Sequence, residues 1–81
     1  MSQPAIRIAA LYKFGHVPDP MTLQHELKPV CVSESVCGTL IVAEEGINGT
    51  IAGPAAGVET VLNVIRAIPG FDDLEIKESW A

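Results

Sequence analysis

The residues with the clearest potential for chemistry or binding lie in one stretch, AEEGINGTIAG, from Ala43 to Gly53. Two adjacent glutamates, Glu44 and Glu45, precede a glycine-rich run. Carboxylate pairs serve acid–base catalysis, and successive backbone amides of a glycine-rich turn can hold an anion. Consecutive side chains of a strand point to opposite faces, however, so Glu44 and Glu45 are not an acid–base pair by spacing alone.

Ordinary structural roles compete with these functions. The glycines and Asn48 suit turn geometry, and one glutamate could bond to hairpin amides while the other is solvated. Ile47 is expected to be exposed at the hairpin tip, where an apolar residue usually packs against its own domain or a partner. A metal site formed by Glu44, Glu45 and Asp72 has no further support. We therefore predict no metal, no cofactor and no catalytic residue in this chain.

The cysteines and histidines offer little chemistry. Cys31 and Cys37 are six positions apart, and the chain has no CxxC motif or His/Cys cluster. A disulfide framework in a small secreted domain normally uses four or more cysteines. We expect free, largely buried thiols, with a redox or nucleophilic role as the alternative. His16 and His25 are isolated in the sequence and are expected at the surface.

The charge balance restricts the partners. Ten acidic residues face five basic ones, which gives a net charge of −5. This disfavours strong autonomous binding to nucleic acid or to anionic membranes, because phosphate binding depends on Lys and Arg. No apolar run approaches the roughly 20 residues of a membrane span, and no signal peptide is recognisable. A cytoplasmic location is the default expectation.

The first half of the chain indicates a strand and a helix. Residues 5–14 (AIRIAALYKF) alternate with period two, which is typical of a strand, and the apolar content of both faces favours a central one. Asp19 and Pro20 suit an N-cap and first helical position. Pro29 then predicts either a helix that ends near Lys28 with a second stretch from Pro29, or one kinked helix.

The second half indicates two strands, a helix and a last strand. Residues 37–45 and 48–53 are the expected strands, and Asn48-Gly49 is a strong hairpin signal. Because Gly46 precedes it, we expect a connection longer than two residues. A helix is predicted from Pro54 to the stop at Pro69-Gly70, since its apolar residues recur at helical spacing. Residues 71–81 supply the last strand, with Leu74 and Ile76 facing inward.

The order β-α-β-β-α-β predicts a single α+β domain over residues 1–81 with the ferredoxin-like sandwich. This fold has a four-stranded antiparallel sheet with the first and third strands in the centre, two helices on one face and an open second face. The pattern stops at Trp80-Ala81 in the middle of a strand. We therefore expect the chain to be a piece of a longer protein.

Two activities known from small domains of this fold can be tested on the sequence. Acylphosphatases, which share the βαββαβ order, cradle phosphate in a glycine-rich, arginine-bearing loop after the first strand. The corresponding loop here, residues 13–18 (KFGHVP), has one glycine and no arginine. We reject acylphosphatase activity. A metallochaperone would need CxxC in this loop, and that motif is absent.

Three segments carry a more specific resemblance: AALYKF, GTLIVAEEGINGTIAG and IPGFDDLEIKESWA. Together with Pro29 inside the first helical segment, they resemble the N-terminal acylphosphatase-like domain of the rhodanese-related tRNA uridine hydroxylase family over residues 6 to 80. The resemblance implies a rhodanese domain that follows in the same polypeptide. It also implies oxygen-dependent conversion of a wobble uridine of tRNA to 5-hydroxyuridine by the whole, cytoplasmic protein.

The catalytic cysteine of that family belongs to the rhodanese domain, so neither Cys31 nor Cys37 inherits its role. The resemblance implies that this chain alone is inactive and helps to position tRNA or the rhodanese active site. The candidate contact residues are Lys13, Glu44, Glu45, Gly46, Ile47, Asn48 and Gly49. The alternative is a structural module that docks on the rhodanese domain without touching the substrate.

Overall fold

Four strands and two helices form the six elements of the computed structural model, which describes residues 6–81. In chain order they are β1 (Ile6–Phe14), α1 (Pro20–Ser33), β2 (Cys37–Ala43), β3 (Gly46–Pro54), α2 (Ala55–Arg66) and β4 (Glu75–Trp80). The predicted β-α-β-β-α-β order is confirmed. Ala5, where the first strand was expected to begin, lies outside the described residues.

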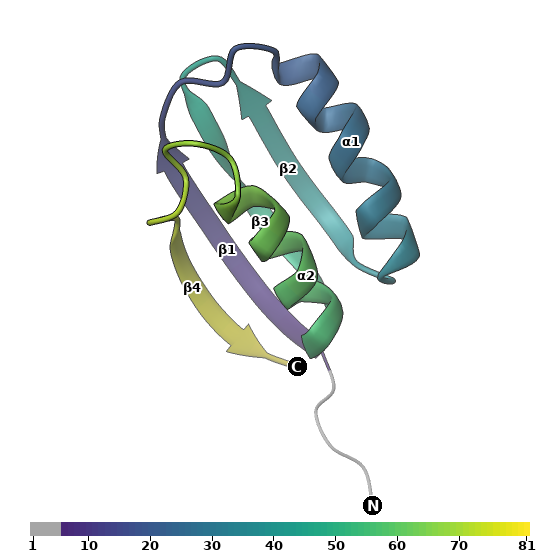
Figure 1. Cartoon of the computed structure of the whole chain (residues 1–81). Helices are drawn as coiled ribbons and strands as arrows, with labels where there is room; N and C mark the ends of the chain where they lie inside the picture. The colour runs from purple at the N-terminus through teal and green to yellow at the C-terminus, as the bar shows by residue number, and fades with distance from the viewer. Residues whose placement is uncertain (1–5) are drawn as a thin grey trace, which may run out of the picture.

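The four strands form one antiparallel sheet in the order β2-β3-β1-β4. Both helices cover the same face of this sheet, and no helix or strand of residues 6–81 covers the opposite face (Figure 1). The ferredoxin-like arrangement is therefore confirmed, with β1 and β3 in the centre and β2 and β4 at the edges.

Helix α1 begins at a side-chain cap and runs through its internal proline. The Asp19 carboxylate accepts hydrogen bonds from the backbone N–H of Thr22 at 3.1 Å and from its hydroxyl at 2.8 Å. These bonds lower the pKa of Asp19. Pro29 lies inside one continuous helix, so of the two alternatives the single helix is confirmed and the break near Lys28 is wrong, while its kink stays a prediction.

The core lies between the sheet and the two helices. Helix α2 turns a complete apolar stripe toward the sheet, whereas Leu27 is the only fully buried residue of α1. Gly57 allows α2 to pass close to the end of α1, because a Cβ there would lie 2.5 Å from the Glu34 carbonyl oxygen. The buried apolar residues are Ala9, Leu11, Val17, Leu27, Val36, Ile47, Ile51, Val58, Val61, Leu62, Ile65, Phe71 and Leu74.

The β2–β3 hairpin turns at Glu44 and Glu45, and the prediction of a longer connection around Asn48-Gly49 is wrong. Ala43 pairs with Gly46, so the connection has two residues. Asn48 and Gly49 lie inside β3 in an extended backbone, which excludes the predicted nest of amides. This register places Ile47 in the core, where it is 1% exposed, and the prediction of an exposed Ile47 is also wrong.

The glycines of this hairpin permit close contact between strands. Gly46 has φ +155° and Gly49 has φ +154°. A Cβ on Gly46 would lie 2.3 Å from the Lys13 carbonyl oxygen, and one on Gly49 would lie 2.0 Å from the Thr39 carbonyl oxygen. Strand β3 therefore requires glycine at two positions: at Gly46, where its backbone approaches β1, and at Gly49, where it approaches β2.

Candidate binding surface on the open sheet face

The open face of the sheet carries exposed apolar side chains. Because Ala9 and Leu11 of β1 are buried under the helices, alternation places Tyr12 and Phe14 on the open face. Phe14 is 71% exposed, Tyr12 46% and Ile41 of β2 54%. A cluster of large apolar groups in water is a common mark of a contact surface.

A shallow depression lies at the end of this face where the hairpin turns. We call it the open-face depression; its lining residues are Tyr12, Lys13, Phe14, Ile41, Ala43, Glu45, Gly46, Ile47 and Asn48. Five of the seven predicted contact residues are among them: Lys13, Glu45, Gly46, Ile47 and Asn48. Glu44 and Gly49 do not line it, and Ile47 contributes from the core side.

The aromatic pair was missed at the sequence level. The Tyr12 and Phe14 rings stand edge to face, with centroids 5.5 Å apart and planes at 90°. One ring therefore supports the other in an orientation that aromatic pairs prefer. The signal was present in the sequence, because two aromatics separated by one residue in a strand must share a face.

Asn48 provides the polar group of the depression. It pairs with Tyr12 on one side and with Ile41 on the other, so its side chain lies between apolar neighbours on the open face. The side chain is exposed, and among residues 6–81 its amide has no hydrogen-bond partner. An amide both donates and accepts, so this position can bond to a nucleobase edge or to a peptide group.

The charges around the depression do not favour phosphate. Lys13 donates to the Asp73 carboxylate at 3.0 Å, and this bond lowers the pKa of Asp73. The single cation of the lining is therefore already paired, and Glu45 adds a negative charge. Base stacking or apolar protein contact suits the surface better than binding to a phosphate backbone.

The hairpin turn and the loop after β1 form one unit. The backbone N–H of Gly15 donates to the Glu45 carbonyl at 3.0 Å, and that of Val17 donates to the Glu44 carbonyl at 2.9 Å. The two glutamates thus hold the loop through their carbonyl groups, whereas a side-chain bond to hairpin amides was predicted. The elements that carry the predicted contact residues are fixed to one another by these bonds.

The arginines lie elsewhere. Arg7 donates to Glu59 at 2.7 Å and pairs with Glu78, and Arg66 donates to the other oxygen of Glu59 at 3.0 Å. These bonds, from Arg7 first and then Arg66, lower the pKa of Glu59. Both arginines are therefore engaged with carboxylates away from the loop after β1.

Within residues 6–81, the remaining cysteine, histidine and acidic side chains do not assemble into a site. Both thiols are free, as expected. Cys31 is half-buried and Cys37 is exposed, so the expectation of burial is wrong for Cys37. His16 and His25 are exposed, as predicted. Over residues 6–81 no three His, Cys, Asp or Glu side chains are grouped for a metal ion. None of the helices in this part of the chain has the length and hydrophobicity that a membrane crossing requires.

The sequence is similar to one protein family over nearly its whole length. The profile described as "UPF0176 acylphosphatase like domain" matches residues 6–81. A protein of Caulobacter vibrioides (strain NA1000 / CB15N) named tRNA uridine(34) hydroxylase is 53% identical over 75 residues, which are 93% of this chain and 24% of that protein.

Two further relatives carry the same name. The protein of Rhizobium leguminosarum bv. trifolii is 54% identical over 74 residues, 91% of this chain and 24% of its own length. That of Gluconobacter oxydans is 51% identical over 76 residues, 94% of this chain and 24% of its own length. The chain spans about a quarter of the length of these curated relatives.

Proposed function

Because the chain belongs to the UPF0176 acylphosphatase-like domain family, we propose that it is the accessory N-terminal domain of a tRNA uridine(34) hydroxylase. In this proposal a following rhodanese domain of the same cytoplasmic polypeptide carries the catalytic cysteine and forms 5-hydroxyuridine at the wobble position. The domain described above contributes contacts and no reacting group. It helps to position tRNA or the rhodanese active site.

The observation that carries this role is the open-face depression. Two exposed aromatic rings and an unbonded amide lie together on a rigid sheet, at the end where the hairpin and the loop after β1 are bonded to each other. Unpaired RNA bases stack on aromatic side chains and present their edges to amides. An aromatic surface without a free cation suits the unpaired bases of a tRNA loop, while phosphate contacts fall to other parts of the protein.

The test uses the longer, tRNA-hydroxylating protein. We expect Phe14→Ala and Asn48→Ala to reduce hydroxylation of tRNA by about ten-fold each, which corresponds to the roughly 1–3 kcal/mol of one lost stacking contact or base-edge contact. Met21→Ala is the matched control, because Met21 is 68% exposed but belongs to α1 on the other side of the sheet. It should leave the rate unchanged.

A direct docking role without substrate contact is favoured by a second observation, the apolar character of the open face beyond the depression. Ile6 of β1, which does not line the depression, is 41% exposed. If the face serves only to dock on the rhodanese domain, Phe14→Ala lowers the melting temperature of the whole protein and leaves its tRNA affinity unchanged. Lower tRNA affinity at unchanged melting temperature supports the substrate-contact role.

A further inference from the structure

The two edges of the sheet differ in charge. Edge strand β4 carries Glu75, Lys77 and Glu78, and charged side chains are a usual protection against pairing with another strand. Edge strand β2 has the sequence CGTLIVA over Cys37–Ala43, with no charge and no proline. Within residues 6–81 no strand pairs with its outer side. Its outward N–H and C=O groups are therefore available to a further strand.

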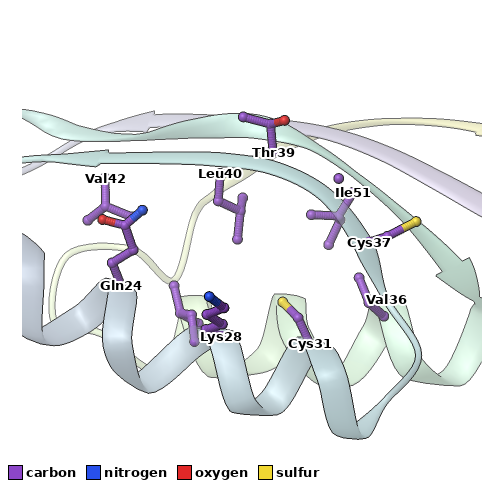
Figure 2. Close-up of a pocket in the computed structure, with 11 residues that line it drawn as sticks. Gln24, Lys28, Cys31, Val36, Cys37, Thr39, Leu40, Val42 and Ile51 are labelled. Carbon is purple, nitrogen blue, oxygen red and sulfur yellow. The ribbon is translucent and has the colours of Figure 1, made fainter.

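A groove runs beside this unprotected edge, between β2 and α1. Figure 2 shows Leu40 and Val42 pointing from β2 toward the helix and Cys31 pointing from the helix toward the sheet. The groove exists because α1 buries little of its surface; Leu27 alone is fully buried. Its volume is about 370 Å³, which is within the range of sites that bind ligands. The apolar lining is completed by Val36 and Ile51.

The groove has one cation at its rim. Lys28 lines the groove from α1, is exposed, and forms no ion pair within the described part of the chain. Arg7, Lys13 and Arg66 are all paired with carboxylates. Among the basic side chains of residues 6–81, only Lys28 and Lys77 have no ion pair. A carboxylate on whatever occupies the groove would meet an unpaired ammonium group.

We propose that the β2 edge and the groove beneath it bind an extended peptide segment of a partner protein as a fifth strand of the sheet. Strand addition draws its affinity from main-chain hydrogen bonds and its specificity from alternate side chains that enter a pocket. Here the inward side chains of the segment are apolar at both ends of the groove and acidic opposite Lys28. The unpaired backbone of β2 is the reason for a peptide occupant, because a peptide can form main-chain hydrogen bonds with its outward N–H and C=O groups and a small apolar ligand cannot.

A second copy of this chain fits the edge less well. Symmetric antiparallel pairing of two β2 strands about Leu40 would bring two Lys28 side chains together, because Lys28 lies opposite Leu40 across the groove (Figure 2). Like charges across an interface oppose association, so the charge pattern favours a partner segment with a carboxylate.

The test is a titration of the 81-residue chain with a blocked peptide, Ac-TVTETVT-NH2, followed by amide chemical shifts. This peptide places valines and one glutamate on the same side. We expect shifts along β2 and the facing side of α1. The charge reversal Lys28→Glu should weaken binding of this peptide about five- to ten-fold, because one ion pair at the rim becomes a repulsion. The same variant should prefer a peptide in which Lys replaces the central Glu. Lys77→Glu on β4 is the matched control and should not change the affinity.

Several results would overturn the proposal. Shifts that map to the open sheet face, or no shifts at all, exclude strand addition at β2. Equal affinity of the parent chain and Lys28→Glu for both peptides excludes the carboxylate contact. If the β2 amides shift on dilution of the chain without peptide, the edge pairs with a second copy, and the partner segment is wrong. Both variants change exposed side chains, so loss of folding does not confuse these outcomes.

Discussion

Ile47 and Ile41 provide a matched test of the hairpin register. Both are isoleucines of adjacent strands, but Ile47 is 1% exposed in the core and Ile41 is on the open face. The change Ile47→Ala removes three buried carbon atoms, worth about 2.4 kcal/mol at ~0.8 kcal/mol each, and leaves a cavity. We expect the free energy of unfolding to fall by about 3 kcal/mol, within the range of about 2–5 kcal/mol for such truncations.

The assay is thermal and urea unfolding of both single variants. For a domain of this size about 3 kcal/mol corresponds to a decrease of roughly 12–24 °C in melting temperature. Ile41→Ala should cost below about 1 kcal/mol, because its side chain is already in water and loses mainly strand propensity. Equal losses in the two variants would refute the register, since they would mean that Ile47 lies at an exposed hairpin tip.

Three further outcomes follow from the same structure. In urea unfolding, Gly49→Ala should cost more than Gly70→Ala, because both have positive φ but nothing lies within 4 Å of a Cβ at Gly70; equal costs would contradict the strand contact. The pKa of Glu59 is lowered in the folded chain, so its contribution to stability is present above its ordinary pKa of 4.5 and is lost as the pH falls. Acid titration of Glu59→Gln should therefore show a smaller loss of stability below this pH than the parent chain. With a thiol reagent, Cys37 should react before Cys31, because Cys31 is half-buried and burial raises its pKa; the reverse order in a mass spectrum would exclude this exposure.

The architecture could be predicted from the sequence because the main signals were periodic patterns of apolar residues. The alternation in β1 and the helical stripe of α2 each depend on many residues, so one ambiguous position could not change the element. The capping by Asp19 was also local and was confirmed. At Pro29 the sequence left two alternatives open, because proline removes a backbone donor and crowds the preceding turn, and the structure has the continuous helix.

The hairpin was mispredicted because Asn48-Gly49 is a signal of two residues, whereas the strand register depends on pairing along the whole of β3. β3 pairs with β1 over nine residues and with β2 over seven. Turning at Glu44 and Glu45 keeps Ile47 on the core face beside Val42, whereas a turn at Asn48 would remove Ile47 from the core. The gain from burying an isoleucine, about 1.5–3 kcal/mol, exceeds the preference of one dipeptide for a turn.

The two proposed surfaces could not be derived from the sequence for a related reason. Alternation shows that Tyr12 and Phe14 share a face, but only the position of the helices decides that this face is open. The groove at β2 depends on how far α1 stands from the sheet, which no single residue encodes.

The charges give the two surfaces different chemistry. Of five basic residues, three are paired with carboxylates on the helix-covered side or its rim, and Lys28 and Lys77 are the two without an ion pair in the described structure. The open-face depression contains neither of them, so it can contribute stacking and amide contacts but little counterion release. The β2 groove contains Lys28, so it can select a carboxylate. If the domain has the proposed role in tRNA modification, the phosphate backbone is held elsewhere and the exposed aromatic rings supply the contact of this domain.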